Sequence, residues 1–361
     1  MKLVSNAATA SRVRGMSLLV LLVAAAALLP GVSSFAGGGN RRGTAAADQL
    51  LVPVGARGIA LGGAPLSGIS GTEAIYYNPA GLAGMSTSVD VRFSHMSGFD
   101  ADGLNYAAVG ASFAGFGHVG LSIKSFSFGD IVYTDERNPD GTGAVFAPTF
   151  VDLGITYARA LTDRIRAGLT AHIVSEELNR VSSSGIAFDI GVQYHGLANV
   201  RGLQLGVALK HLGSAMAFDG PGLYRTVNEI GSDREGQLLK IEAAGFQMPT
   251  SIEIGMGYVR DLAPEHVLTV SSSFENNNFL PDQYRMAVEY GYMNLFFARA
   301  SYTLAGGDAA DVNGESSYLF GPSFGAGVRQ NAGSIAFEFD YAYRTAKVFK
   351  GSHAFTLGIT F

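Results

Sequence analysis

Two short patterns match the letters of known cofactor-binding or catalytic motifs, and both lie where that chemistry cannot be built. Residues 115–120 have the glycine spacing of a dinucleotide-binding loop, which must follow a strand and open a helix. Here the pattern falls at a turn between two segments of alternating hydrophobicity. Residues 321–325 match the nucleophile elbow of serine hydrolases, but Ser323 lies beside Pro322 inside an expected strand, where no elbow can form. We predict neither activity.

The other groups that could do chemistry are scattered along the chain. The seven histidines form no pair at metal-ligand spacing, and there is no cysteine to act as a nucleophile, a metal ligand or a disulfide partner. A net charge of −5 indicates no basic surface for nucleic acid. We therefore predict that the protein is not an enzyme, with no catalytic residue, no metal, no cofactor and no nucleic-acid partner.

Most of the chain after residue 88 alternates between apolar residues and polar or small ones. A period of two predicts strands with one apolar face. The 48 glycines among 361 residues agree with this, because a glycine inside a helix costs about 1 kcal/mol relative to alanine. The runs predict fourteen strands, at 88–96, 103–114, 117–128, 148–160, 165–177, 184–195, 201–212, 249–260, 265–275, 282–291, 294–304, 317–329, 333–344 and 352–361.

The connections between these strands alternate in length. Those after even-numbered strands are short, whereas those after odd-numbered strands are longer, notably 129–147, 213–248 and 305–316. A secreted two-sheet sandwich, the alternative, has no reason to keep its long loops at one end, but outer-membrane barrels do. We therefore predict an all-β fold, a 14-stranded antiparallel transmembrane outer-membrane β-barrel over residues 88–361, with outer-membrane lipid around it.

The first 36 residues have the pattern of a secretory signal peptide. Three basic side chains precede an apolar run from Met16 to Leu29, and small residues lead to Ala36. The alternative, a membrane helix, needs about 20 apolar residues, and this run is shorter. We expect cleavage near Ala36, a separate segment over residues 37–87, and a location in the outer membrane of a Gram-negative-type bacterium.

The last predicted strand places four apolar residues on one face. It resembles the C-terminal recognition strand of outer-membrane barrels, and the resemblance implies the barrel assembly machinery as a partner. The four residues are Phe355, Leu357, Ile359 and Phe361.

Eight charged side chains lie opposite the apolar faces of the predicted strands. If the apolar faces contact lipid, these charges point into the lumen, where opposite signs can pair with one another or with a segment held inside. We expect a structural network that holds that segment; the alternative is a charge-lined permeation path. Arg57 is the expected cation of the inner segment. The eight are Arg166, Asp189, Glu253, Arg285, Glu289, Arg299, Glu338 and Asp340.

Residues 37–87 do not alternate, and two motifs stand out in them. Thr72 is placed to cap a short helix that runs through Tyr77. Asn78 and Pro79 should end this helix, because the residue before a proline avoids the helical conformation. The glycines allow tight packing and left-handed turns. The motif residues are Arg57, Gly58, Gly62, Gly63, Asn78, Pro79, Ala80 and Gly81.

Together these two motifs resemble the N-terminus of the PorV/PorQ family of outer-membrane proteins, which is related to FadL-type transporters of hydrophobic compounds. The sequence-specific part of the resemblance covers about residues 55–83. It implies a fourteen-stranded barrel, which the strand count reaches independently. It also implies that residues 37–87 sit in the lumen as a plug, or hatch.

Two functions follow from the resemblance. The first is a secretion or assembly partner of the type IX secretion kind, which receives secreted or surface proteins, with the long loop near 213–248 as the binding surface. The alternative is a FadL-like transporter or channel for hydrophobic small molecules, gated by the N-terminal hatch, with a hydrophobic ligand as its partner.

Overall fold

The computed structural model describes residues 43–98, 101–227, 236–306, 318–347 and 350–361. The expected signal peptide, residues 1–36 with cleavage near Ala36, lies outside the described residues, as does the start of the segment 37–87. Within the described ranges, no helix combines the length and apolar character needed to cross a bilayer.

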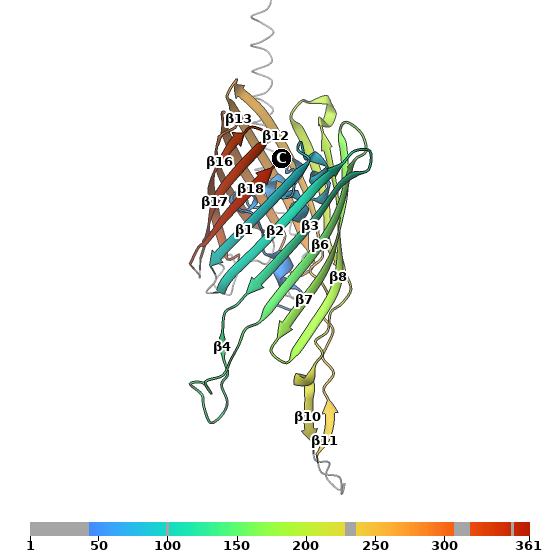
Figure 1. Ribbon diagram of the computed structural model, residues 1–361, viewed down its shortest axis with the longest axis vertical. Coiled ribbons are helices and arrows are strands. Elements are labelled where there is room, and N and C mark those ends of the chain that lie inside the picture. The colour runs from blue at the N-terminus through green and yellow to red at the C-terminus, as the bar shows by residue number, and fades with distance from the viewer. Residues whose placement is uncertain (1–42, 99–100, 228–235, 307–317, 348–349) are drawn as a thin grey trace, which may run out of the picture. The chain divides into compact units, whose positions relative to one another are not determined.

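In the described part of the chain, fourteen strands form one closed antiparallel barrel (Figure 1). Each strand pairs with its neighbours in chain order, and the ring closes between the first and the last. This confirms the predicted fold class. The strands are β1 (Val89–Gly98), β2 (Ala101–Phe113), β3 (Gly117–Ser127), β6 (Thr149–Ala160), β7 (Ile165–Leu178), β8 (Val181–His195), β9 (Leu203–Gly213), β12 (Ser251–Ala263), β13 (His266–Asn277), β14 (Gln283–Tyr292), β15 (Phe296–Ala305), β16 (Phe320–Ala332), β17 (Ile335–Ala346) and β18 (Ser352–Thr360).

The barrel closes along the full length of its last strand. β1 pairs with β18 from Asp90 opposite Thr360 to Ser97 opposite His353. Beyond this register, Val89 N–H donates to the Phe361 carbonyl (2.7 Å) and Phe361 N–H donates to the Val89 carbonyl (3.0 Å). Closure leaves the ring without a free edge strand, as a bilayer requires.

The two faces of the wall differ sharply in polarity. On β8, Ile186 and Ile190 point outward and are 52% and 46% exposed, whereas the intervening Ala187 and Asp189 are buried inside. Phe355 and Leu357 on β18, and Phe361 directly after it, are exposed on the outer face in the same way. An apolar outer wall around a polar interior is the reverse of a water-soluble barrel and suits lipid.

Three features of the loops were not predicted from the sequence. Two hairpins extend from the ends of strands (Figure 1): β4 (Ile131–Val132) with β5 (Val145–Phe146), and β10 (Tyr224–Val227) with β11 (Gln237–Lys240). They are too short to give a recognisable alternation. The third is a tight turn at residues 179–180, where a longer connection was expected and the prediction is wrong; Asn179 adopts a left-handed conformation (φ 54°) there.

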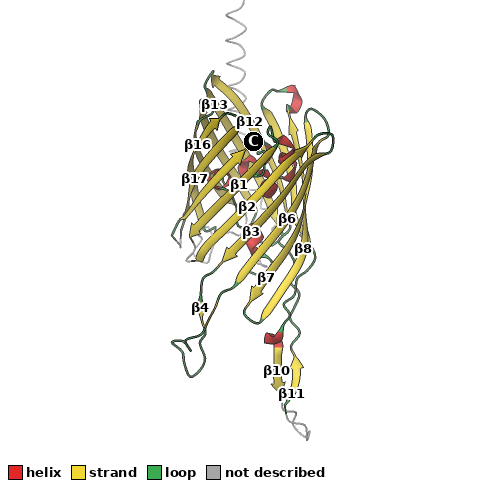
Figure 2. Ribbon diagram, in the orientation of Figure 1, coloured by secondary structure: helices red, strands yellow, loops and turns green. Residues whose placement is uncertain are grey.

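Between residues 43 and 88, five short helices precede β1 and lie within the ring of strands (Figure 2). They pack against strands on every side: α2 contacts β15 to β18, η3 contacts β9 and β12 to β14, and η4 contacts β3 and β6 to β8. We call residues 45–85 the luminal segment. Its helices are η2 (Asp48–Leu51), α2 (Ala56–Ala60), η3 (Ala64–Ser67), α3 (Ala74–Tyr77) and η4 (Pro79–Gly84).

Candidate functional site

Glycines in the barrel wall make room for the luminal segment. A Cβ atom at Gly168 on β7 would lie 2.4 Å from the carbonyl carbon of Pro79 and 2.5 Å from the nitrogen of Ala80. A Cβ atom at Gly191 on β8 would lie 2.0 Å from Asn78 Oδ1. Real Cβ contacts are never this short, so the luminal backbone touches the wall directly at β7, and the Asn78 side chain does so at β8. Small residues on the inner face thus set how closely the segment fits.

The glycines of the luminal motifs serve close approach and chain reversal. Gly58 lies on the ring of Tyr77, with 2.3 Å from a hypothetical Cβ to the ring atoms, and Gly81 lies equally close to the Ile69 carbonyl oxygen. Gly62 and Gly63 have φ values of 58° and 77° where α2 ends, a conformation that side chains with a Cβ disfavour.

Asn78 joins three parts of the lumen through its side chain. Its Oδ1 accepts from Ala80 N–H (3.2 Å), which caps η4 at the Pro79 step, and its amide donates to the carbonyls of Leu66 and Val192 (3.1 Å each). The side chain is fully buried. α3 ends at Tyr77, as predicted. Asn78 therefore also fixes η3 and η4 to β8.

Replacing Asn78 by Ala should loosen this junction. The variant loses the four hydrogen bonds of the Asn78 side chain, each worth about 0.5–1.5 kcal/mol, and leaves the Leu66 carbonyl with Gln193 Nε2 as its remaining side-chain partner. We expect backbone hydrogen exchange over residues 64–69 and 79–84 to quicken at least about tenfold. Asn331→Ala, at an exposed position on β16, is the control and should change nothing; equal exchange in both variants would contradict the role of Asn78.

The expected cap at Thr72 is wrong. α3 begins at Ala74 after Glu73, without a side-chain cap, and Thr72 Oγ1 has no hydrogen-bond partner. Instead, Thr72 N–H donates to Asp90 Oδ2 on β1 (2.9 Å). Glu73 Oε1 accepts from Gly58 N–H (2.9 Å). A carboxylate of the wall thus binds the backbone before α3, and Glu73 in turn accepts from an N–H in the first turn of α2.

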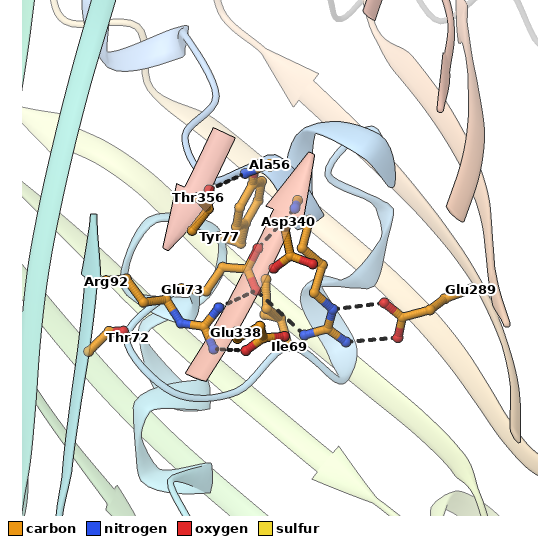
Figure 3. Close-up of polar contacts among 12 residues, drawn as sticks. Ala56, Ile69, Thr72, Glu73, Tyr77, Arg92, Glu289, Glu338, Asp340 and Thr356 are labelled. Carbon is orange, nitrogen blue, oxygen red and sulfur yellow. Dashed lines mark hydrogen bonds and ion pairs between the residues drawn. The ribbon is translucent and has the colours of Figure 1, made fainter. Parts of the chain in front are cut away.

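Arg57 is the main cation of the luminal segment. It makes a two-pronged contact with Glu289 on β14 (Nε 2.8 Å, Nη2 3.0 Å) and lies 3.5 Å from Glu73 (Figure 3). Burial lowers the pKa of Arg57, but these two carboxylates outweigh burial and hold it well above its usual value. The guanidinium stays charged at any pH of interest and ties α2 to the wall.

The pairs continue from Arg57 in two directions. Glu289 also accepts from Arg299 Nε on β15 (2.6 Å), and Arg299 Nη1 donates to Asp340 on β17. On the other side, Glu73 lies 3.9 Å from Arg92 on β1, which pairs with Glu338 on β17 (2.9 Å, Figure 3). We call this connected set the hatch network: Arg57, Glu73, Arg92, Glu289, Arg299, Glu338 and Asp340.

Four of the eight predicted luminal charges belong to the hatch network, and four lie elsewhere. Glu253 and Arg285 pair with each other (3.2 Å) near the long-loop end. Asp189 accepts from His211 N–H (2.6 Å) and faces His172. Arg166 lies beside Gly84, with no carboxylate partner among the residues that the structure describes. The predicted set is therefore several groups rather than one.

Sequence reasoning missed two members of the hatch network. Arg92 alternates with Val91 and Phe93, so the criterion that selected the other charges would have found it. Glu73 was interpreted as a residue of a helix start, and nothing in its spacing shows that it reaches Arg57 and β1. Its role follows from the fold of the luminal segment, whose sequence shows no regular alternation from which side-chain directions could be predicted.

A cavity of about 410 Å³ lies beside the luminal segment, at the end of the barrel that carries the long loops. Its lining includes strand residues next to those loops, such as Phe126, Glu253 and Arg344, and residues 48–49 and 51–53 of the luminal segment. Aromatic rings make up much of it. These are Tyr76, Tyr77, Phe126, Phe128, Phe150, Tyr318 and Phe320.

The charged groups around the cavity are mostly engaged. Lys210 pairs with Glu253 (3.3 Å), and its Nζ lies 4.1 Å from the ring centre of Tyr76. Arg285 binds Glu253 and Glu275. Arg344 stacks on Phe320 and donates to Tyr318 Oη (3.2 Å). Paired charges and stacked rings leave a largely apolar space, which is what a binding pocket for a small organic molecule requires.

No protein-family model matches the sequence, and no curated protein matches it. Solved structures match the fold. CymD, a monoaromatic hydrocarbon channel, aligns with a TM-score of 0.51 and 13% identity, over 86% of this chain and 98% of that one. The Pseudomonas putida toluene transporter TodX aligns with a TM-score of 0.50 and 11% identity, over 82% and 96%. A Pseudomonas aeruginosa FadL homologue aligns with a TM-score of 0.48 and 12% identity, over 86% of this chain and 98% of that one. At these identities the likeness shows the fold alone, a closed antiparallel barrel like those of CymD and TodX.

Proposed function

We propose that this protein is an outer-membrane channel for small hydrophobic molecules, in which the luminal segment is the hatch. The cavity carries the proposal: it is apolar, lined by aromatic rings, and bounded on one side by the hatch itself. A molecule bound there contacts both the wall and the part that would have to move. The hydrocarbon and toluene channels of the same fold support this function.

The outer membrane is the proposed location. The outer wall is apolar all around, the connections at one end are short, and the other end carries the long loops 128–148, 214–250 and 306–319. These are the features of barrels in that membrane. We also propose that Phe355, Leu357, Ile359 and Phe361, on the lipid face and at the closing pair, serve recognition by the barrel assembly machinery.

The hatch network suits a clamp better than a permeation path. Each of its carboxylates lies against at least one guanidinium, and Asp340 and Arg299 are almost completely buried. Charges that neutralise one another in a dry site hold structure in place, because separating them leaves an unpaired buried ion. Passage therefore requires the luminal segment to shift, rather than ions to move past it.

The secretion-partner function rests on the PorV/PorQ resemblance alone. The solved structures that share the fold favour the channel instead. A surface protein bound at the long loop near 213–248 stays a prediction, which co-purification from detergent would test.

The absence of tryptophan from the sequence allows a direct test of the cavity. Leu51 lines the cavity, so a Leu51→Trp variant places the only indole there. Phenylnaphthylamine, an apolar aromatic probe, should bind saturably and quench this indole by energy transfer. Leu161→Trp, at an exposed position in a short turn at the other end of the barrel, is the control.

The two variants together decide between binding and mere partitioning. If the probe only dissolves in the detergent belt, both indoles should be quenched alike and without saturation. Saturable quenching confined to Leu51→Trp supports the cavity as a binding site. Transfer of the probe across vesicles that contain the protein then tests the channel.

A further inference from the structure

The first residues of the luminal segment are held by an outer loop. Ala45 forms a parallel bridge with Gln247, and Ala46 N–H donates to the Gln247 carbonyl (2.9 Å). Next to this bridge, Ala46, Ala47 and Leu50 pack with Met216 and Met248 in one buried apolar cluster. Gln247, Met216 and Met248 all belong to the loop 214–250. The loop that carries the β10–β11 hairpin therefore contacts the hatch directly.

Residues 45–52 depend on these contacts because they have little structure of their own. η2 is a single uncapped turn, and Ala47 before it adopts a left-handed conformation (φ 55°) that alanine disfavours. On the other side, two side chains bind its carbonyls: Lys124 Nζ donates to those of Val52 (2.6 Å) and Leu50 (3.4 Å), and Tyr76 Oη donates to that of Leu50 (3.1 Å). Segments held by few contacts open at low cost.

The outer loop is itself well fixed at the point of contact. Met216 and Phe246 exchange both backbone hydrogen bonds (2.8 and 2.7 Å). Asp219 exchanges both backbone hydrogen bonds with Ser182 on β8 (2.9 and 2.8 Å). Farther out, Lys240 pairs with Asp219 (2.7 Å) and lowers the pKa of its carboxyl through a hydrogen bond. Asp219 thus joins the hairpin strand β11 to the part of the loop that leads to Met216.

Two wall glycines show that the methionines are seated in the barrel. A Cβ atom at Gly185 would lie 2.6 Å from Met248 Cε, and one at Gly213 would lie 2.3 Å from Met248 Sδ. Met216 and Met248 are almost fully buried. The loop therefore reaches down to the wall and closes over Leu50 there, next to the cavity residues Asp48, Gln49 and Leu51.

We propose that Met216, Gln247 and Met248 are a latch: residues 45–52 leave the cavity only when the outer loop releases them. Release also frees the Leu50 carbonyl to move away from Tyr76, whose ring lines the cavity. Events on the outer surface at the loop thereby control the hatch. This inference rests on the proposed function, and the experiments below separate the two.

The first experiment does not depend on transport. The chain has no cysteine, so Ala46→Cys provides a single buried thiol next to the latch. In a background of Met216→Ala and Met248→Ala, we expect a water-soluble maleimide to label this thiol at least tenfold faster than in the otherwise unchanged chain. Met286→Ala, on the lipid face of β14, is the control. Equal labelling rates in all three would overturn the latch.

The second experiment removes no packing. Ala45→Cys with Gln247→Cys places two thiols at bridge partners, where strand neighbours are close enough for a disulfide. Oxidation should stop transfer of phenylnaphthylamine into vesicles, and a reducing agent should restore it. Failure to oxidise would contradict the bridge, and undiminished transfer in the oxidised form would contradict the latch.

The two readouts distinguish the possible failures. If the unmodified protein transfers no probe, the proposed function is wrong, and the labelling rates alone decide on the latch. If transfer occurs and the oxidised pair does not affect it, the function stands and the latch is wrong. A heat-dependent gel shift confirms that each variant is a closed barrel. If the variant with both Met216→Ala and Met248→Ala lacks this shift, the disulfide experiment alone decides whether the latch exists.

Discussion

Replacing Arg299 by Met is expected to destabilise the barrel by about 3–5 kcal/mol, the usual cost of removing one partner from a buried ion pair. The Arg299 side chain is 1% exposed and contacts both Glu289 and Asp340. Without it, Asp340 keeps no cation within ion-pair distance among the described residues, although it is fully buried. Urea unfolding in phospholipid vesicles, followed by the heat-dependent gel shift, measures the loss.

Two further variants show whether the stranded charge is the cause. Arg329→Met removes the half-exposed partner of Glu338 at the margin of the network and should cost about 1 kcal/mol or less. Adding Asp340→Asn to Arg299→Met should recover part of the stability, because a neutral amide replaces the unpaired carboxylate. A double variant no more stable than Arg299→Met would show that lost packing, rather than charge, explains the effect.

Replacing Gly168 by Val is expected to unseat the luminal segment while leaving the barrel closed. The new Cβ atom would overlap the backbone of Pro79 and Ala80, and backbone cannot turn aside as a side chain can. Since closely packed interiors tolerate little added volume, η4 must leave the wall. Trypsin should then cleave after Arg57, which the unchanged protein shields, and passage of apolar probes should rise.

The neighbouring residue on the same strand provides the control. Ala167 points to the opposite face of β7 from Gly168, so Ala167→Val adds a similar group toward the lipid. It should leave both protease resistance and passage unchanged. Resistance to trypsin in the Gly168→Val variant would mean that the segment is not held by its contact with β7.

The strands could be predicted almost completely from the sequence, and the lumen could not. The period of two places residues such as Ile186 and Asp189 on opposite faces wherever the strand begins, so the wall follows from local pattern. The contacts of Glu73 and Asn78 join residues far apart in the chain, including the Val192 carbonyl on β8. No spacing encodes such contacts. Asp189 and Arg166 show the limit: their inward direction was predictable, but whether each side chain meets a partner depends on the neighbouring strands.

The pairing of β1 with β18 has a consequence for the order of folding. The luminal segment precedes every strand, yet Ala56 N–H donates to Thr356 Oγ1 across 300 residues of sequence, and the ring closes between Asp90 and Thr360. Contacts this distant form slowly. Since the wall touches the segment too closely to admit it afterwards, the segment must be in place when the last strand joins the first. It then acts as a template around which the ring assembles. Its removal should slow closure of the barrel more than it lowers the free energy of unfolding of the closed barrel.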